Sequence, residues 1–334
     1  MNTKNKAVGL GELLLRLTSP SGVRLPDAGS FRANYGGSEA NVILSLCHLG
    51  HEGVMLSKVA KDEIGDACID FLRKNRMDVS LLKRDVNPLG IYFLEEGEGS
   101  RPSKVVYNRK FSSATKMQPD DFDYEKAFDG AFVLHVSGIT LAISESARKT
   151  ALEAMKKAKE LGVKVSFDFN YRAKLMTVEE AKEVYPLVAQ YADIVSASPW
   201  DIKTLLSFHP DEIDNDRLFM DACKHFGFDY LFTKRRTILS ARSQMLQSFC
   251  YDEDHKYEGS ERKFEIFDRI GAGDAFTAGY LHGLMLDYQN PLKAMDYGIA
   301  NCVLEQTVFG DAAIFSHEEL EEYLSTSGLE EVKR

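Results

Sequence analysis

The segment FDRIGAGDAFTAGYLHGLM, residues 267–285, places two glycines and a carboxylate where an apolar helix pattern begins. Backbone N–H groups at the start of a helix have no partner within the helix, and they carry a partial positive charge. Glycines at this point let an anion approach the backbone closely. Gly271, Ala272 and Gly273 therefore predict a cradle for a phosphate or an oxyanion, where charge that develops during a reaction would be stabilised.

Asp274 follows this cradle directly. A carboxylate that only bound a ligand there would repel the anion, so the position favours a base that takes a proton from an attacking hydroxyl. The alternative is an early-helix acid that stabilises the helix dipole by roughly 0.3–1 kcal/mol. The spacing alone leaves both interpretations open. No Gly-Lys-Ser/Thr follows, so the segment is not a Walker A phosphate-binding loop. The third glycine of a dinucleotide-binding fingerprint is also absent, so the segment is not that motif either.

The composition limits the class of protein. The 334 residues are 44% apolar and 28% charged, which suits one large α/β domain or two smaller ones. The net charge of -10 argues against nucleic-acid binding. The five cysteines are scattered without a C-x-x-C pair, which argues against a disulfide framework or a zinc site. Glu12 and Arg16 interrupt the first apolar run, and the uncharged run 131–144 is too short to span a bilayer, so we expect a soluble cytoplasmic protein.

The second half of the chain alternates between strand-like and helix-like segments. This alternation predicts a parallel sheet covered by helices on both faces. The first half has the same rhythm, with a helix, a strand and a second helix. The expected strands are 53–60, 131–138, 163–169, 193–198 and 228–233, and the expected helices are 36–51, 64–77, 144–162, 177–192, 199–207 and those that begin near 272 and 291.

Two segments of a different kind interrupt the first half, at 23–35 and 89–109. The second has two β-rich arms around the turn-forming residues EEGEGSRPS, so it predicts a hairpin. Strands inserted between βα units usually leave the main sheet. We therefore predict a single α/β domain over residues 1–334 with a small β lid formed by about 16–35 and 88–113.

The wider pattern resembles a known family. DRIGAGDAFTAGYLHGL is similar to the D-T-x-G-A-G-D signature of the ribokinase-like (PfkB) carbohydrate kinases, with Asp268 kept and Arg269 in place of threonine. A second, glycine-rich signature of that family resembles YGGSEANVILSLCHLG at 35–50, and its opening strand resembles VGLGELLLRL at 8–17. This resemblance covers nearly the whole chain. It implies a three-layer α/β/α fold with a central, mainly parallel sheet plus a small β-sheet lid, and it implies ATP and Mg²⁺ as cofactors.

Three shorter segments resemble the 2-keto-3-deoxygluconate kinases of this family: FDFNYR at 167–172, VVYNR at 105–109 and FGDAAIF at 309–315. Fructokinases share part of the first segment. The residue types support a sugar acid independently, because Arg109 and Arg172 would converge on one carboxylate and the arginine fork suits bidentate binding. The alternative for each arginine is a solvated cation on the lid or on a loop.

The resemblance also implies roles for individual residues. Asp274 would take the proton from the terminal hydroxyl of the substrate, and the cradle residues Gly271, Ala272 and Gly273 would complete the catalytic group. The residues expected to bind the substrate are Gly36, Gly37, Asn41, Tyr92, Tyr107, Arg109, Arg172, Asp274 and Asp311. The residues expected to bind the nucleotide are Asn170, Arg172, Ser198, Thr233, Lys234, Arg235, Gly271, Ala272, Gly273 and Asn301, with Asp201 holding Mg²⁺ through water.

Structural alternatives stay open for several of these residues. Asn41 would otherwise be an amide on a helix surface, and Asn301 an ordinary buried amide. Asp311 would otherwise be a turn aspartate after Gly310, and the two tyrosines would be packing residues.

Two departures from the family pattern affect these roles. The N-x-x-E motif, which organises magnesium and phosphate through water, appears as SPWD at 198–201, where Ser198 is equally an N-cap before Pro199. The T-x-G-x-x-G nucleotide loop appears as FTKRRTILSA at 232–241, without either glycine. Its polar side chains would then hold the phosphates in place of close backbone contacts.

The sequence therefore predicts an ATP-dependent kinase that phosphorylates 2-keto-3-deoxygluconate at its terminal hydroxyl to give 2-keto-3-deoxy-6-phosphogluconate. The alternatives are a fructokinase or a kinase of a related deoxyketo sugar acid, and, from another class, a non-catalytic sugar-sensing protein on a kinase fold. No nucleic-acid or membrane partner is expected. An exposed lid with apolar strands such as GIYFL needs covering, so we expect a homodimer through the lid.

Overall fold

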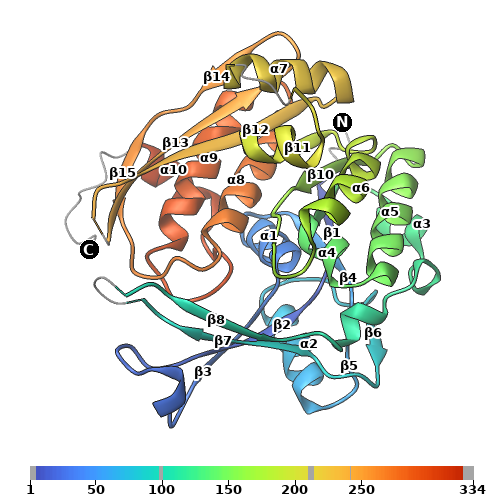
Figure 1. The fold of residues 1–334 in the computed structure, drawn as a ribbon, viewed down its shortest axis with the longest axis vertical. Coiled ribbons are helices and arrows are strands. Elements are labelled where there is room, and N and C mark those ends of the chain that lie inside the picture. Colours follow the sequence, from blue (N-terminus) through green and yellow to red (C-terminus); the bar gives the residue numbers. More distant parts are fainter. Residues whose placement is uncertain (1–4, 98–100, 210–213, 241, 326–334) are drawn as a thin grey trace.

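The computed structural model describes residues 5–97, 101–209, 214–240 and 242–325. A nine-stranded sheet runs through this part of the chain in the order β14-β13-β12-β11-β10-β9-β1-β4, with β15 paired to β13 (Figure 1). Its strands are β1 (Lys6–Leu10), β4 (Glu52–Leu56), β9 (Ala131–Ser137), β10 (Lys164–Asp168), β11 (Ile194–Ser196), β12 (Tyr230–Ile238), β13 (Ser243–Tyr251), β14 (Lys256–Glu258) and β15 (Arg262–Glu265). Neighbouring strands from β4 to β12 are parallel, and β13 begins an antiparallel edge.

Helices cover both faces of this sheet, so it has two hydrophobic cores. One core contains α3 (Tyr124–Phe128), α5 (Glu145–Glu160), α6 (Val178–Ala189) and α7 (Asn215–Phe226). The other contains α1 (Ser38–His48), α2 (Glu63–Lys74), α8 (Ala272–Leu286) and α9 (Pro291–Glu305). Ala7 of β1 belongs to one core and Val8 to the other, as the two-residue alternation of a strand requires. The predicted α/β fold with a mainly parallel sheet is confirmed.

Shorter helical elements complete the body of the protein. They are α4 (Gly138–Ile143), α10 (His317–Ser325), a π-helical turn at Asp201–Leu205, and 3-10 turns at Leu25–Asp27, Ser113–Lys116 and Pro119–Asp121. Among the described residues, no helix has both the length and the apolar character needed to cross a membrane.

A separate four-stranded sheet, called here the small sheet, lies along the lower edge of the molecule in Figure 1. Its order is β3-β2-β7-β8, with β2 (Leu14–Thr18), β3 (Arg32–Gly36), β7 (Gly90–Glu95) and β8 (Lys104–Asn108). β7 and β8 form the antiparallel hairpin expected from the sequence, although residues 98–100 of its turn lie outside the described part. The small sheet begins at residue 14 rather than near 16.

Two expected strands are each divided between sheets. The opening segment 8–17 ends its first strand at Leu10 and resumes as β2 at Leu14, in the small sheet. The segment 53–60 breaks after Leu56, and β5 (Lys58–Ala60) pairs with β6 (Lys83–Asp85) in a two-stranded sheet. Both halves of each segment are extended, so an apolar run does not reveal that the chain changes its pairing partner between them.

The prediction that residues 232–241 form a nucleotide-binding loop is wrong for most of this segment, which is a strand. Residues up to Ile238 continue strand β12, in antiparallel register with β13 from Leu231↔Tyr251 to Ile238↔Gln244. The pairing with β13 satisfies the backbone of this polar segment, whose outer residues from Arg235 onward are exposed. Residue 241 lies outside the described part.

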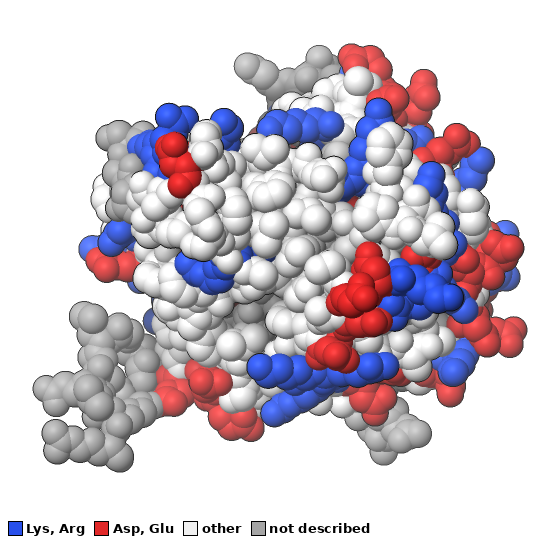
Figure 2. Space-filling model, turned by 90° about the horizontal axis from the view of Figure 1, so that it is seen from below, with Lys and Arg blue, Asp and Glu red and all other residues white. Residues whose placement is uncertain are grey.

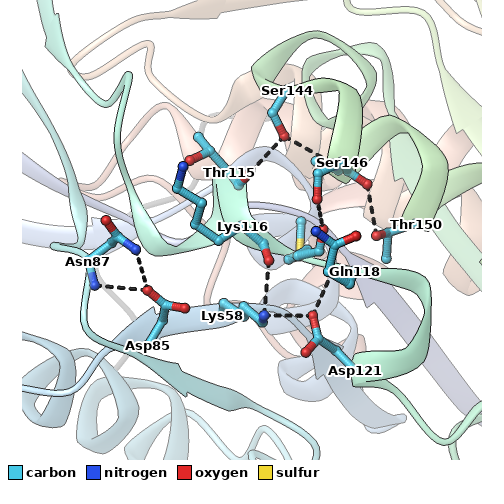
Figure 3. A network of polar contacts seen from close by, with 12 residues as sticks. Lys58, Asp85, Asn87, Thr115, Lys116, Gln118, Asp121, Ser144, Ser146 and Thr150 are labelled. Carbon is cyan, nitrogen blue, oxygen red and sulfur yellow. Dashed lines mark hydrogen bonds and ion pairs between the residues drawn. The ribbon is translucent and has the colours of Figure 1, made fainter.

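A polar network attaches β5 to the segment that leads from the small sheet into the body (Figure 3). Lys58 Nζ donates to the carbonyl oxygen of Lys116 over 2.9 Å and forms an ion pair of 2.8 Å with Asp121. Ser144, the N-cap of α5, donates to the carbonyl oxygen of Thr115 over 2.8 Å. These contacts hold residues 115–121 against both β5 and α5, and so they fix the chain that follows β8.

Lys58→Met should lower the free energy of unfolding by about 1.5–3 kcal/mol, the usual contribution of hydrogen bonds to charged groups. The Lys58 side chain is largely enclosed, at 12% exposure, and removal of its ammonium group leaves Asp121 without this cation. Urea denaturation would measure the loss. Lys61→Met, at an exposed position just beyond β5, is the matched control. Equal stability of the two variants would show that the network contributes little.

Candidate active site

A cavity of about 730 Å³ lies where the carboxyl ends of β10 and β11 meet α8 and the small sheet. The crevice outside the carboxyl ends of parallel strands is the usual ligand site of such folds. Most of the residues singled out in the sequence line it: Gly37, Asn41, Tyr92, Tyr107, Arg109, Asn170, Arg172, Ser198, Asp201, Thr233, Lys234, Gly271, Ala272, Gly273, Asp274 and Asp311. Three do not, and they are Gly36, Arg235 and Asn301.

The predicted anion cradle is formed by the first turn of α8. Gly271 caps the helix with φ +97°, and a Cβ there would lie 2.0 Å from the backbone oxygen of Asp311, so only glycine fits. The first intrahelical bond runs from the Ala275 N–H to the Gly271 oxygen, which leaves the three preceding amides without helical partners. A Cβ on Gly273 would lie 4.0 Å from Lys234 Nζ. An anion in the cradle would therefore meet both amides and an ammonium group.

Asp274 faces this cavity from the same turn. Its Oδ2 accepts a hydrogen bond from Asn41 Nδ2 over 2.7 Å, and its Oδ1 accepts one from Ser38 Oγ over 3.1 Å. Burial raises the pKa of Asp274 to about 7, with a further contribution from the nearby charge of Asp168, while the two hydrogen bonds lower it. A carboxylate with a pKa near neutrality suits proton transfer better than simple stabilisation of a helix end.

A chain of polar contacts holds Asp274 in place. Asn41 Oδ1 accepts from the Gly37 amide over 3.2 Å, and Asn170 Nδ2 donates to Ser38 Oγ over 3.0 Å. Asn41 is therefore not a helix-surface amide, because its side chain orients the carboxylate. The sequence interpretation missed Ser38, whose position directly after Gly37 at the start of a helix was the available signal.

The small sheet supplies one wall of the cavity. Tyr92 Oη donates to Asp311 Oδ2 over 2.7 Å, and the rings of Tyr92 and Tyr107 lie 5.8 Å apart. Asp311 also forms an ion pair of 3.0 Å with Arg16. Asp311 is thus held by two residues of the small sheet, which is more than a turn aspartate requires, and no role had been assigned to Arg16.

Arg109 reaches the cavity from just beyond β8, but it is not a solvated cation. It is 8% exposed and pairs with the carboxylate of Glu12, which also accepts from Ser112. Burial raises the pKa of Glu12, whereas the charge of Arg109 lowers it. Arg172 is exposed in the cavity and forms no ion pair within the described ranges. The carboxylate of Glu12 therefore compensates part of the Arg109 charge, while the charge of Arg172 is available to a ligand.

Two carboxylates lie beside the cradle. Burial raises the pKa of Asp168, with Lys234 lowering it and the charge of Asp201 raising it further. Asp201 accepts hydrogen bonds from the Ser198 amide over 2.7 Å and from Ser198 Oγ over 2.6 Å. Ser198 Oγ also accepts a hydrogen bond from the Asp201 amide over 3.3 Å, and Ser198 lines the cavity. A divalent cation would relieve the repulsion between Asp168 and Asp201, and their hard oxygen ligands fit Mg²⁺ with water.

Residues 3–295 match the family model described as pfkB family carbohydrate kinase. The chain belongs to this family. It is 30% identical to a 2-dehydro-3-deoxygalactonokinase of Haloferax volcanii over 95% of this chain and 96% of that protein. It is 31% identical to a 2-dehydro-3-deoxygluconokinase of Thermoproteus tenax over 95% of this chain and 93% of that protein. The solved structure of a 2-dehydro-3-deoxygluconokinase from Thermotoga maritima is similar with a TM-score of 0.91 and 33% identity, covering 96% of this chain and 98% of that one.

Two nucleotide-binding residues expected in this PfkB kinase are corrected by the structure. Arg235 points away from the cavity, where it donates to Gln247 over 2.5 Å and lies over the ring of Phe249. Neighbouring residues of a strand face opposite sides, so Lys234 and Arg236 line the cavity instead. Arg236 was missed because the segment had been interpreted as a loop.

Asn301 is the second correction. Its side chain is fully buried, and its amide donates to Ser45 Oγ over 2.9 Å and to the Ala275 oxygen over 2.7 Å. It therefore packs α9 against α1 and α8 and does not line the cavity. Gly36 is also displaced from the cavity surface, but a Cβ there would lie 2.8 Å from Asn41 Oδ1, so it lets the cavity-lining amide approach.

Turnover by this PfkB kinase should depend on the ionised fraction of Asp274. We expect kcat/KM to fall about tenfold per pH unit below a midpoint near the Asp274 pKa of about 7, because the protonated carboxyl cannot accept a proton. A pH profile of initial rates would measure it. Ser38→Ala should move the midpoint to higher pH, since Ser38 stabilises the ionised form. A midpoint unmoved by this change would contradict the assignment.

Proposed function

We propose that this PfkB kinase phosphorylates 2-keto-3-deoxygluconate, also named 2-dehydro-3-deoxygluconate, at its terminal hydroxyl. MgATP is the donor and 2-keto-3-deoxy-6-phosphogluconate the product. The observation that carries the proposal is that two arginines, Arg109 and Arg172, line the same cavity as Asp274. A sugar acid offers a carboxylate to the arginines at one end and an alcohol to the base at the other. The names of the similar kinases support the same substrate class.

The residues divide the reaction between them. Asp274 takes the proton from the terminal hydroxyl, which contributes about 10²–10⁴-fold to the rate. The cradle amides, with Lys234 beside Gly273, hold the transferring phosphoryl group and stabilise its charge. Arg236 extends this positive surface toward the donor. Asp168 and Asp201 would hold Mg²⁺, which would neutralise phosphate charge there.

The substrate is positioned from the small sheet and from the ends of the parallel strands. Arg109 and Arg172 hold its carboxylate, Tyr92 and Tyr107 enclose its carbon chain, and Asp311 accepts a bond from a hydroxyl. Enclosure by the small sheet excludes water, so the phosphoryl group reaches the sugar rather than a solvent molecule. Positioning of this kind supplies most of the catalysis in phosphoryl transfer.

A substrate panel tests the proposal. ATP consumption should be high with 2-keto-3-deoxygluconate and low with fructose and with gluconate, which lacks the keto group. Preference for fructose would establish the fructokinase alternative. Trp200 is the single tryptophan of the chain and lines the cavity, so its fluorescence reports binding separately from turnover. Binding of the sugar acid without phosphoryl transfer would identify a sugar sensor and end the kinase proposal.

The outer face of the small sheet is the proposed contact with a second copy of the chain. Figure 2 shows this underside of the molecule, on which uncharged side chains cover much of the middle, with groups of charged side chains between them and toward the edges. Phe31 and Val106 are 38% and 43% exposed, and Phe31 packs edge-on against Phe93 of β7. An apolar face beside the open strand β8 favours self-association. Light scattering that shows a monomer at working concentration would contradict this part of the proposal.

A further inference from the structure

Arg16 is a charged residue with 1% exposure, and it belongs to β2 of the small sheet. Its guanidinium forms ion pairs with Asp311 over 3.0 Å and with Asp268 over 3.5 Å. Removing a charged group from water costs free energy, and in a buried ion pair this cost can exceed the attraction between the charges. Stability alone therefore does not explain why a buried arginine is present here. The explanation offered by the structure is the position of the two carboxylates.

Each carboxylate belongs to a loop that shapes the cavity. Asp268 Oδ1 accepts a hydrogen bond from the Ile270 amide over 3.1 Å, which fixes the turn directly before Gly271. The backbone oxygen of Asp311 packs closely against Gly271, where a Cβ would lie 2.0 Å from it. One guanidinium therefore touches both chain segments that enclose the N-terminal end of α8.

Arg16 also acts together with Tyr92. The two residues are register partners on the parallel strands β2 and β7, and both bind the carboxylate of Asp311. Tyr92 lines the cavity from the small sheet and Asp311 from the body of the protein. Arg16 and Tyr92 thus attach the small sheet to the body of the protein through Asp311. Asp311 lies between the part of the cavity proposed for the sugar acid and the anion cradle at Gly271.

We propose that Arg16 is a positioning residue that fixes Asp311 for the substrate and holds the turn 268–271 of the anion cradle in register with the small sheet. This inference rests on the proposed kinase function for its kinetic consequences, but its structural consequence does not depend on turnover. Arg16 does not itself line the cavity, so it acts through Asp311 and Asp268.

The charges around Asp311 define a pH signature for this role. Arg16 and Tyr92 face Asp311 from the small sheet, and Asp268 faces it from the cradle loop. Burial raises the pKa of Asp311 and the charge of Arg16 lowers it. Glu305 of α9 lies in the same cluster without a hydrogen bond to either carboxylate oxygen among the described residues, and burial raises its pKa to about 10. Arg16 therefore supplies the largest contribution that lowers the pKa of Asp311, followed by the hydrogen bond from Tyr92.

The kinetic test compares Arg16→Met with Arg101→Met, which removes another arginine that precedes β8 in the β7–β8 hairpin and whose partner, Glu95, does not line the cavity. Arg16→Met should lower kcat/KM for 2-keto-3-deoxygluconate by about 10²-fold, the usual effect of a small misplacement in an active site. As the pH is lowered, the KM of this variant for the sugar acid should begin to rise at a higher pH than in the parent protein. The reason is that Asp311 has lost the charge that lowers its pKa. Arg101→Met should change neither quantity. Parent-like kinetics in Arg16→Met would overturn the inference while leaving the proposed function intact.

A second measurement keeps the inference testable without turnover. Hydrogen exchange at the Ile270 amide should be faster in Arg16→Met than in Arg101→Met, because the acceptor Asp268 loses its anchor. If Arg16→Met does not fold, Arg16→Lys keeps the charge but not the fork, and it should show part of each effect. Asp311→Asn combined with the Arg16 variant should cost less than the sum of the two single changes. Unchanged exchange at Ile270, or strict additivity, would overturn the inference, and inactivity of the parent protein on every sugar acid would instead refute the proposed function.

Discussion

Asp274→Asn should lower kcat by about 10²–10⁴-fold while the affinity for the sugar acid changes little. The substitution keeps the size and most hydrogen bonds of the side chain, so Ser38 and Asn41 can still contact it. It removes the basic oxygen that accepts the proton from the substrate hydroxyl. Single-turnover assays give the rate, and Trp200 fluorescence gives the affinity. The effect is expected on the chemical step because the interaction strengthens only as the hydroxyl loses its proton.

The matched control for this change is Asp287→Asn, at the opposite end of the same helix. Asp287 is exposed, and its carboxylate accepts a bond from the Gln289 amide rather than facing the cavity. This variant should retain parental kinetics. If Asp274→Asn turned over at a near-parental rate, the carboxylate would be a helix-stabilising residue after all, and the proposed mechanism would lose its base.

The elements that depend on local sequence were predicted from it. Caps and periodicity identify α5, whose N-cap Ser144 bonds the Ala147 amide, and the glycine-rich start of α8. The resemblance to a family then selected residues most of which line one cavity. Gly271 and Asp274 are close in the chain as well as in space, so their spacing carries the geometry.

What the sequence did not show were contacts between distant residues. Arg109 and Glu12 are 97 positions apart, and Arg16 and Asp268 are 252 apart, so neither pair leaves a local pattern. The error at Arg235 has a different origin, because one decision between loop and strand determines which of two adjacent arginines faces the cavity. Which face a strand side chain points to depends on the register of the strand, because a shift by one residue moves every side chain to the opposite face.

Arg172→Met should lower kcat/KM for the sugar acid by about 10- to 150-fold, the equivalent of losing a charge-assisted hydrogen bond of about 1.5–3 kcal/mol. Arg172 is exposed in the cavity, so its removal does not disturb the core. Activity on fructose, which has no carboxylate, should be little changed, and selectivity is therefore the decisive measurement. Lys174→Met, an exposed cation two residues further along, controls for the general charge of the loop. Equal losses on both sugars would show that Arg172 serves the phosphoryl group instead.

Arg109 needs a different design, because Arg109→Met alone would leave Glu12 buried without its partner and cost about 3–5 kcal/mol of stability. The paired change Glu12→Gln with Arg109→Met removes both charges together and should fold. In this paired variant the carboxylate keeps Arg172 alone, so selectivity for the sugar acid over fructose should fall without a matching fall in kcat. If selectivity persisted in the paired variant and was lost with Arg172→Met, only Arg172 would bind the acid group, and Arg109 would serve to anchor Glu12 beneath the small sheet.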